Sequence, residues 1–122
     1  MKRFLKIVGI TIIVLVILIS TALLYYFRKQ EIDIGLIPNE FTYCGKQIHG
    51  NDKNYREIVS WLKDNKDGWV PSFASYVPNQ VYRGNSFNIN VLSDAVVVSY
   101  KTDYGFPQYI KGVEHGLKLK CK

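Results

Sequence analysis

The apolar run Ile7–Phe27 constrains this chain more than any other feature of its sequence. It contains no charged residue and no proline. A bilayer core about 30 Å thick needs about 20 apolar residues of helix, which this run supplies. The flanking residues are those of a membrane interface, with cations before the run and aromatic residues and cations at its end: Lys2, Arg3, Lys6, then Tyr25, Tyr26, Phe27, Arg28 and Lys29. The sequence therefore predicts a membrane anchor over residues 1–29, with its N-terminus in the cytoplasm and residues 30–122 exported.

A cleaved signal peptide is the competing interpretation of the same residues. Ser20-Thr21-Ala22 has small residues at both positions that signal peptidase reads. The apolar run continues past Ala22, however, and a signal h-region of about 7–15 residues is shorter than this one. The pattern favours a retained anchor, and both interpretations place the remainder of the chain outside the cytoplasm.

The excess of positive charge lies around the predicted anchor rather than in the exported part. The whole chain has a formal charge of +6, from sixteen Lys and Arg against ten Asp and Glu. Five of the sixteen cations flank the apolar run, so the exported part carries eleven cations and ten acids. Nucleic-acid binding needs a basic face, which this balance does not offer. We therefore expect no nucleic-acid partner.

The two cysteines, Cys44 and Cys121, lie near opposite ends of the exported part. An even pair in an oxidising compartment predicts a disulfide. Closing a loop of about 77 residues would stabilise the fold by at most about 4.5 kcal/mol. No CxxC is present, and His49 and His115 show no ligand spacing, so we expect no metal site and no cofactor.

Patterning predicts an α+β domain over residues 41–122, joined to the anchor by a tether at 30–40. One helix is expected at 52–65, where Tyr55, Ile58, Val59 and Leu62 form an apolar stripe. Alternation and turn signals then predict a mostly antiparallel sheet of about five or six strands. The expected strands are 41–44, 72–77, 80–83, 86–92, 95–102, 108–113 and 117–121, with residues 47–53 as a loop. The predicted core comprises Phe41, Tyr55, Ile58, Val59, Leu62, Phe73, Phe87, Ile89, Val91, Val96 and Val98.

Catalytic motifs are missing from the sequence. It contains no GxSxG, HExxH, P-loop or dinucleotide-binding glycine fingerprint. Asp94 and Asp103 flank one expected strand and would lie about 30 Å apart if it is extended, too far for a glycosidase pair. We therefore expect a protein that is not an enzyme and has no catalytic residues.

Aromatic residues are abundant in the exported part, and tyrosine and tryptophan are enriched at protein interfaces. The loop that begins at Asp103 concentrates them, with Tyr104, Phe106 and Tyr109 in seven residues. We predict these four residues as partner contacts, with Tyr82 and Asn85 at a neighbouring turn as second choices. The alternative is that half of the aromatic residues simply cover the edge of the core. Exposed edge strands in such a sheet would also allow a homodimer.

Three segments together resemble a known class of protein: MKRFLKIVGITIIVLVILIS at the N-terminus, NYREIVSWLKDNKDGW at the helix and QYIKGVEHGLKLKC at the end. The chain resembles type VI secretion immunity proteins, and among them the periplasmic antidotes to VgrG-type effectors with a C-terminal peptidoglycan hydrolase (muramidase) domain. The resemblance implies a periplasmic protein, held at the inner membrane or released by signal cleavage, whose partner is a cognate secreted peptidoglycan hydrolase. It implies no site residues.

Two other functions remain open from the sequence. One is a membrane-anchored accessory subunit of a cell-envelope complex, in which the helix at residues 7–27 itself makes contacts. The other is a small envelope enzyme acting on cell-wall polymer, which would need a cleft with a raised-pKa carboxylate. The antidote hypothesis is favoured because the exported part combines surplus aromatic residues with an absence of catalytic motifs.

Overall fold

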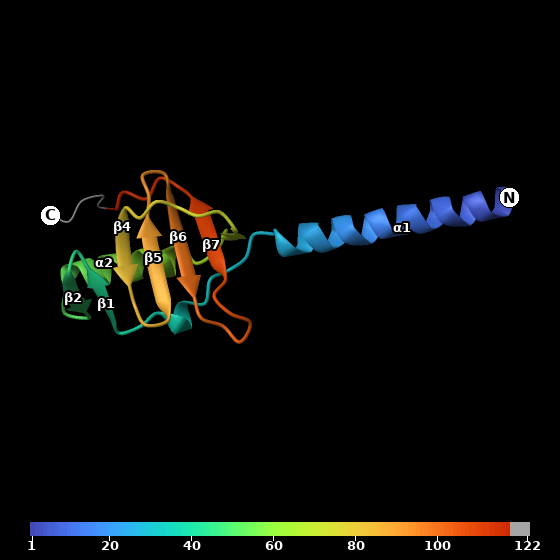
Figure 1. Ribbon diagram of the computed structural model, residues 1–122. Coiled ribbons are helices and arrows are strands. Elements are labelled where there is room, and N and C mark those ends of the chain that lie inside the picture. The colour runs from blue at the N-terminus through green and yellow to red at the C-terminus, as the bar shows by residue number, and fades with distance from the viewer. Residues whose placement is uncertain (118–122) are drawn as a thin grey trace.

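A computed structural model describes residues 1–117 of the chain, and its α+β architecture confirms the predicted fold class. Helix α1 (Lys2–Tyr26) projects away from a small folded domain (Figure 1). None of its residues is buried, and by length and composition it is the one helix within residues 1–117 that could cross a membrane. A helix of this kind fits either a membrane anchor or a signal sequence.

The domain is built on one antiparallel sheet of seven strands, against the five or six expected. Their spatial order is β2-β1-β4-β5-β6-β7-β3. The strands are β1 (Glu40–Tyr43), β2 (Lys46–His49), β3 (Val70–Pro71), β4 (Gln80–Arg83), β5 (Phe87–Val91), β6 (Ala95–Tyr100) and β7 (Gln108–Gly112). The β3–β7 edge lies nearest α1, and β2 lies farthest from it (Figure 1).

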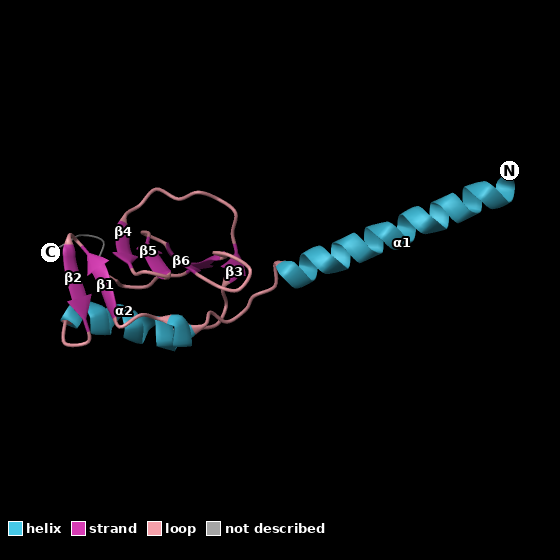
Figure 2. Ribbon diagram, turned by 60° about the horizontal axis from the view of Figure 1, so that its bottom comes forward, coloured by secondary structure: helices cyan, strands magenta, loops and turns pink. Residues whose placement is uncertain are grey.

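Helix α2 (Lys53–Asp64) forms where the apolar stripe predicts it and covers one face of the sheet (Figure 2). Two side chains of this helix, Ile58 and Leu62, are completely buried. Asp52 occupies the N-cap position, but its carboxylate accepts a hydrogen bond from the backbone N–H of His49 (2.9 Å) rather than from the helix. After the helix, Gly68 has a φ of +83°, a left-handed conformation that favours glycine.

The covered face of the sheet holds the core, and strand alternation explains which residues are in it. Phe87, Ile89 and Val91 alternate along β5 and lie opposite Tyr100, Val98 and Val96 of β6, respectively. All six are buried. On this face of the two strands the core prediction is thus confirmed apart from Tyr100, which it omitted.

The opposite face of the sheet is crossed by residues 72–79, and the strand predicted at 72–77 is wrong. This segment has no regular structure and arcs over β4 to β7 (Figure 2). Two side-chain amides hold it: Gln108 Nε2 donates to Ala74 O (2.7 Å), and Asn90 Oδ1 accepts from Asn79 N (3.0 Å). These hydrogen bonds from side chains of the sheet hold the segment in place without a strand ladder.

The crossing segment also explains two errors in the predicted core. Phe73 lies on it and is 78% exposed, so it is not a core residue. Val97, which faces the segment from β6, is only 5% exposed. Strand β6 is covered on both faces, so consecutive residues along it are buried; a strand covered on one face alone would show alternating buried and exposed residues.

Residues 30–40 are packed against the domain rather than forming a free tether. Gln30 and Trp69 exchange two backbone hydrogen bonds (2.8 and 3.0 Å), and Ile32 is buried. A short 3₁₀ helix, η1 (Ile34–Leu36), follows, with the Asp33 carboxylate accepting from Gly35 N (3.0 Å). The apolar residues of this segment extend the core around Trp69, which is completely buried.

Two further expectations concern the first hairpin and the end of the chain. Gln47–His49, predicted as part of a loop, belong to strand β2, which pairs with β1; Ile48 is the one residue of this strand that is buried in the core. Of the strand predicted at 117–121, Leu117 is in no strand and the rest lies outside the described residues. Cys121 also lies outside them, so its predicted disulfide with Cys44 stays a prediction.

Candidate binding surface

The loop between β6 and β7, residues 101–107, is fixed by its own hydrogen bonds. Thr102 N donates to Gly105 O (2.7 Å), and Gly105 N donates to Thr102 O (3.2 Å). The Thr102 hydroxyl accepts from Tyr104 N and donates to Gly105 O, each at 3.2 Å. Gly105 has a φ of +115°, a conformation that side chains strongly disfavour. The sequence thus closes this loop into one preformed turn.

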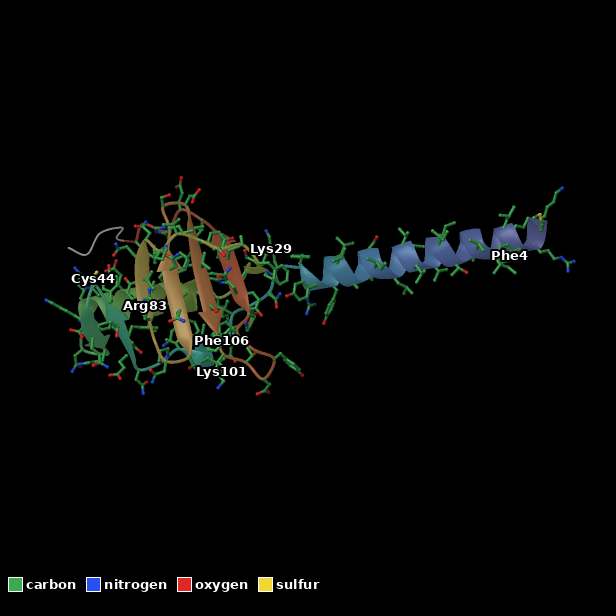
Figure 3. The ribbon with its side chains drawn as sticks, in the orientation of Figure 1. Phe4, Lys29, Cys44, Arg83, Lys101 and Phe106 are labelled. Carbon is green, nitrogen blue, oxygen red and sulfur yellow. The ribbon has the colours of Figure 1, made fainter. Side chains whose placement is uncertain are left out.

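The closed turn presents its aromatic side chains to solvent. Tyr104 is 99% exposed and Phe106 54% exposed, and Asp103 beside them is exposed too. Phe106 lies on the loop that extends beyond the end of β6 (Figure 3). Exposed aromatic side chains on a fixed loop bury a large area on contact at little entropic cost. Three of the six predicted contacts therefore lie together on one accessible loop.

A groove of about 550 Å³ lies beside this loop. It runs between η1, the β4–β5 turn and the start of the loop, and its lining comprises Asp33, Leu36, Ser86, Tyr100, Lys101, Thr102 and Asp103. Two exposed carboxylates and one exposed ammonium group thus border a single depression. Such a surface can accept polar groups of either charge, while Leu36 and the Tyr100 ring supply apolar contact.

Tyr100 anchors the groove to the core. Its ring stacks on Phe87, with 5.3 Å between the ring centroids, and its hydroxyl accepts from Asp33 N at 3.4 Å. Burial raises the pKa of Tyr100 to about 12; the hydrogen bond from the Asp33 backbone N–H lowers this pKa, while the neighbouring Tyr109 and the charge of Asp33 raise it. The hydroxyl is therefore neutral over the physiological pH range.

The turn that carries Asn85 is joined to the same region. Lys101 N donates to the carbonyl of Ser86 (2.9 Å), which ties the β4–β5 turn to the β6–β7 loop. Asn85 is exposed beside Ser86. The structure therefore places this second-choice contact at the same end of the sheet as the aromatic loop.

The remaining two predicted contacts are not on the loop's surface. Tyr82 is 5% exposed and stacks on Tyr43, with ring centroids 4.1 Å apart; burial raises its pKa. Its prediction as a contact is wrong, because the inward register of β4 places it in the core. Tyr109 is half-buried on β7, stacked on Tyr100 (5.7 Å), and faces a crevice of about 220 Å³ near the end of α1.

Of the seven residues that line the groove, sequence reasoning had predicted only Asp103 as a contact and missed the others: Asp33, Leu36, Ser86, Tyr100, Lys101 and Thr102. The first two lie in the segment interpreted as a tether. The spacing of Ile32, Ile34, Leu36 and Ile37 was a signal that this segment packs on the domain, since a free tether has no need of regularly spaced apolar residues.

Other candidate chemistry is sparse within residues 1–117. No group of three or more His, Cys, Asp or Glu side chains there is arranged to hold a metal ion. His115 is half-buried, with Nδ1 accepting from Leu117 N (2.9 Å) and its ring edge-on to Trp61. Its contacts fix the turn after β7.

Comparisons of the chain with protein-family models, with curated proteins and with solved structures gave no significant match.

Proposed function

We propose that this protein is an immunity protein, held in the periplasm, that binds and inhibits a peptidoglycan-degrading toxin delivered by the type VI secretion of neighbouring kin cells. The observation that carries the proposal is the closed β6–β7 turn, which holds Tyr104 almost entirely in solvent. A monomeric domain gains no stability from an aromatic ring in that position. A ring presented in this way is suited to contact with a partner.

The turn's rigidity favours tight inhibition. An inhibitor of a secreted enzyme must bind at low concentration, and ordering a flexible loop on binding would weaken its affinity. Here the hydrogen bonds between Thr102 and Gly105 order the loop before binding. Tyr104 and Phe106 would enter the toxin's cleft, and the groove beside them would receive its rim.

The charges around the groove bear on how the loop meets such an enzyme. Peptidoglycan hydrolases of the muramidase type use acidic catalytic residues. Asp103 would be repelled by ionised carboxylates, whereas Lys101, on the same loop, would be attracted to them. We therefore expect Lys101 to face the acidic part of the cleft and Asp103 to lie at its rim.

Survival in mixed culture tests the proposal. A strain lacking this gene is grown with its parent, whose secretion machinery is active, and is complemented with wild-type protein, Tyr104→Ala or Val77→Ala. Val77 is 83% exposed on the crossing segment, so Val77→Ala is the matched control. We expect rescue by wild type and by the control. Tyr104→Ala should lose about 2–4 kcal/mol of binding energy, a fall in affinity of about 30- to 1000-fold.

A second complementation separates this function from an accessory subunit of a cell-envelope complex. In it, α1 is replaced by an unrelated apolar helix. An antidote keeps its activity after this exchange, whereas a subunit whose anchor makes the contacts loses it. Unchanged survival of the deletion strain, with the parent's machinery shown to be firing, would refute the immunity function.

A further inference from the structure

The end of α1 and the crossing segment meet through aromatic rings. Phe73 stacks on Tyr26 with the ring planes parallel and the centroids 5.8 Å apart, and it lies edge-on to Phe27 at 6.1 Å. Tyr26 and Phe27 are themselves edge-on at 5.2 Å. Phe73 nevertheless remains 78% exposed, so these contacts do not bury it. A large apolar side chain in this position has most of its surface still uncovered.

The length of α1 sets the depth of these rings if the helix spans a bilayer. The stretch from Ile7 to Leu24 rises about 27 Å as a helix, close to the hydrocarbon thickness of about 30 Å. Tyr25, Tyr26 and Phe27 then fall in the interfacial layer, where aromatic side chains are favoured. Arg28 lies over the Tyr25 ring at 4.2 Å, so a cation sits at the level of the lipid headgroups.

The connection between α1 and the domain is too short to let the domain move away from that layer. Gln30 is already paired with Trp69, next to β3. Three Cα–Cα steps join Phe27 to Gln30, a span of at most about 11 Å. The β3–β7 edge therefore stays near the membrane surface whichever way the helix tilts. Figure 1 shows this edge as the part of the sheet closest to α1.

We propose that Phe73 enters the interfacial layer of the bilayer beside Tyr26 and Phe27, and so holds the domain against the membrane by its β3–β7 edge. The occupant of this exposed aromatic surface is lipid. Phe73 is fixed at the required place because Gln108 binds the carbonyl of Ala74, the next residue. This inference depends on a retained α1 and is independent of the proposed antidote role.

Lipid quenching of a tryptophan at position 73 tests this contact in the full-length protein. Phe73→Trp and Val77→Trp are each reconstituted into vesicles of phosphatidylethanolamine and phosphatidylglycerol, with or without lipids brominated near the headgroup end of their chains. Val77 lies on the same segment, is equally exposed and makes no ring contact with α1, so it is the matched control. The native Trp61 and Trp69 give a background that the wild type measures.

We expect brominated lipid to remove about half of the emission added by the Phe73→Trp substitution and little of that added by Val77→Trp. Equal quenching of the two, or none at position 73, would overturn the proposal. Recovery of a mature protein whose N-terminus begins after Ala22 would overturn it too, because α1 would then be removed.

Trypsin digestion gives a readout that does not depend on a new tryptophan. Arg28 and Lys29 form the connection between α1 and the domain (Figure 3 labels Lys29). They directly follow Phe27, whose ring lies 6.1 Å from that of Phe73. In vesicles, Phe73→Ser should speed cleavage at these two residues several-fold, because the domain then lifts from the surface, while Val77→Ser should leave the rate unchanged. Equal rates in all three proteins would contradict the contact.

Discussion

Trp69 joins three parts of the domain, which makes it the position where a small change should be most costly. Its indole Nε1 donates to the carbonyl of Asn65 at 2.6 Å, and Asn65 is the C-cap of α2. Its backbone pairs with Gln30, and its ring meets Trp61 edge-on at 6.2 Å. We predict that Trp69→Phe destabilises the domain for two reasons: the hydrogen bond to Asn65 is lost, and the smaller ring leaves a cavity in a completely buried site.

The magnitude follows from the contacts of the indole. Leaving the Asn65 carbonyl without its buried donor costs about 1–3 kcal/mol. Removing about 40 Å³ of ring from a completely buried site adds about 1 kcal/mol at about 24 cal/mol per Å³. The total is about 2–4 kcal/mol. With a urea m-value of about 1.5 kcal/mol/M, a loss of about 3 kcal/mol lowers the unfolding midpoint by about 2 M.

The assay is urea unfolding of the full-length protein in detergent micelles, followed by fluorescence of the remaining tryptophan and by near-UV circular dichroism. Trp61→Phe is the matched control, since Trp61 is half-buried at the edge of the same cluster. We expect its midpoint to fall by less than about 1 M. Equal falls for the two variants would refute the reasoning, because they would mean that the helix-capping hydrogen bond contributes nothing.

Three other substitutions or conditions give outcomes of known sign. The pKa of Tyr100 is about 12 in the folded state against 10 when unfolded. This difference contributes stability that is complete below pH 10 and is lost as the pH rises toward 12. Over that pH range, the urea midpoint of Tyr100→Phe should therefore fall less steeply than that of the wild type. Gly84→Ala would place its Cβ 2.8 Å from Phe87 O, so we expect thermal unfolding to show a loss of about 1–3 kcal/mol. Gln108→Glu would set a carboxylate against Ala74 O, and hydrogen exchange in residues 72–79 should speed up about ten-fold while β5 and β6 stay protected.

Sequence reasoning worked where one face of an element is buried. The stripe through Ile58 and Leu62 predicted α2, and the alternation of Phe87, Ile89 and Val91 predicted β5. It also placed Tyr104 on an exposed loop, because a short polar and aromatic stretch with glycine and proline favours a turn.

It failed where long-range packing overrides local pattern. Phe73 looks like a core residue in an alternating stretch, yet its segment is held by side chains that come later in the chain, Asn90 and Gln108. Trp69 gave no periodic signal, since its burial depends on Gln30 far away along the chain. Contacts of this kind are set by the assembled sheet and not by neighbouring residues.

The position of β3 at the edge of the sheet also determines the order in which the domain can be completed. Under the proposed export, the residues that follow α1 are threaded across the membrane in chain order, so that β1 and β2 emerge early and can pair at once as a local hairpin. β3 emerges soon afterwards, but its partner β7 follows only after three more strands. Until β7 has been translocated, Trp69 and the adjoining edge stay uncovered beside the anchor. The part of the domain made close to the membrane is thus among the last to become fully folded.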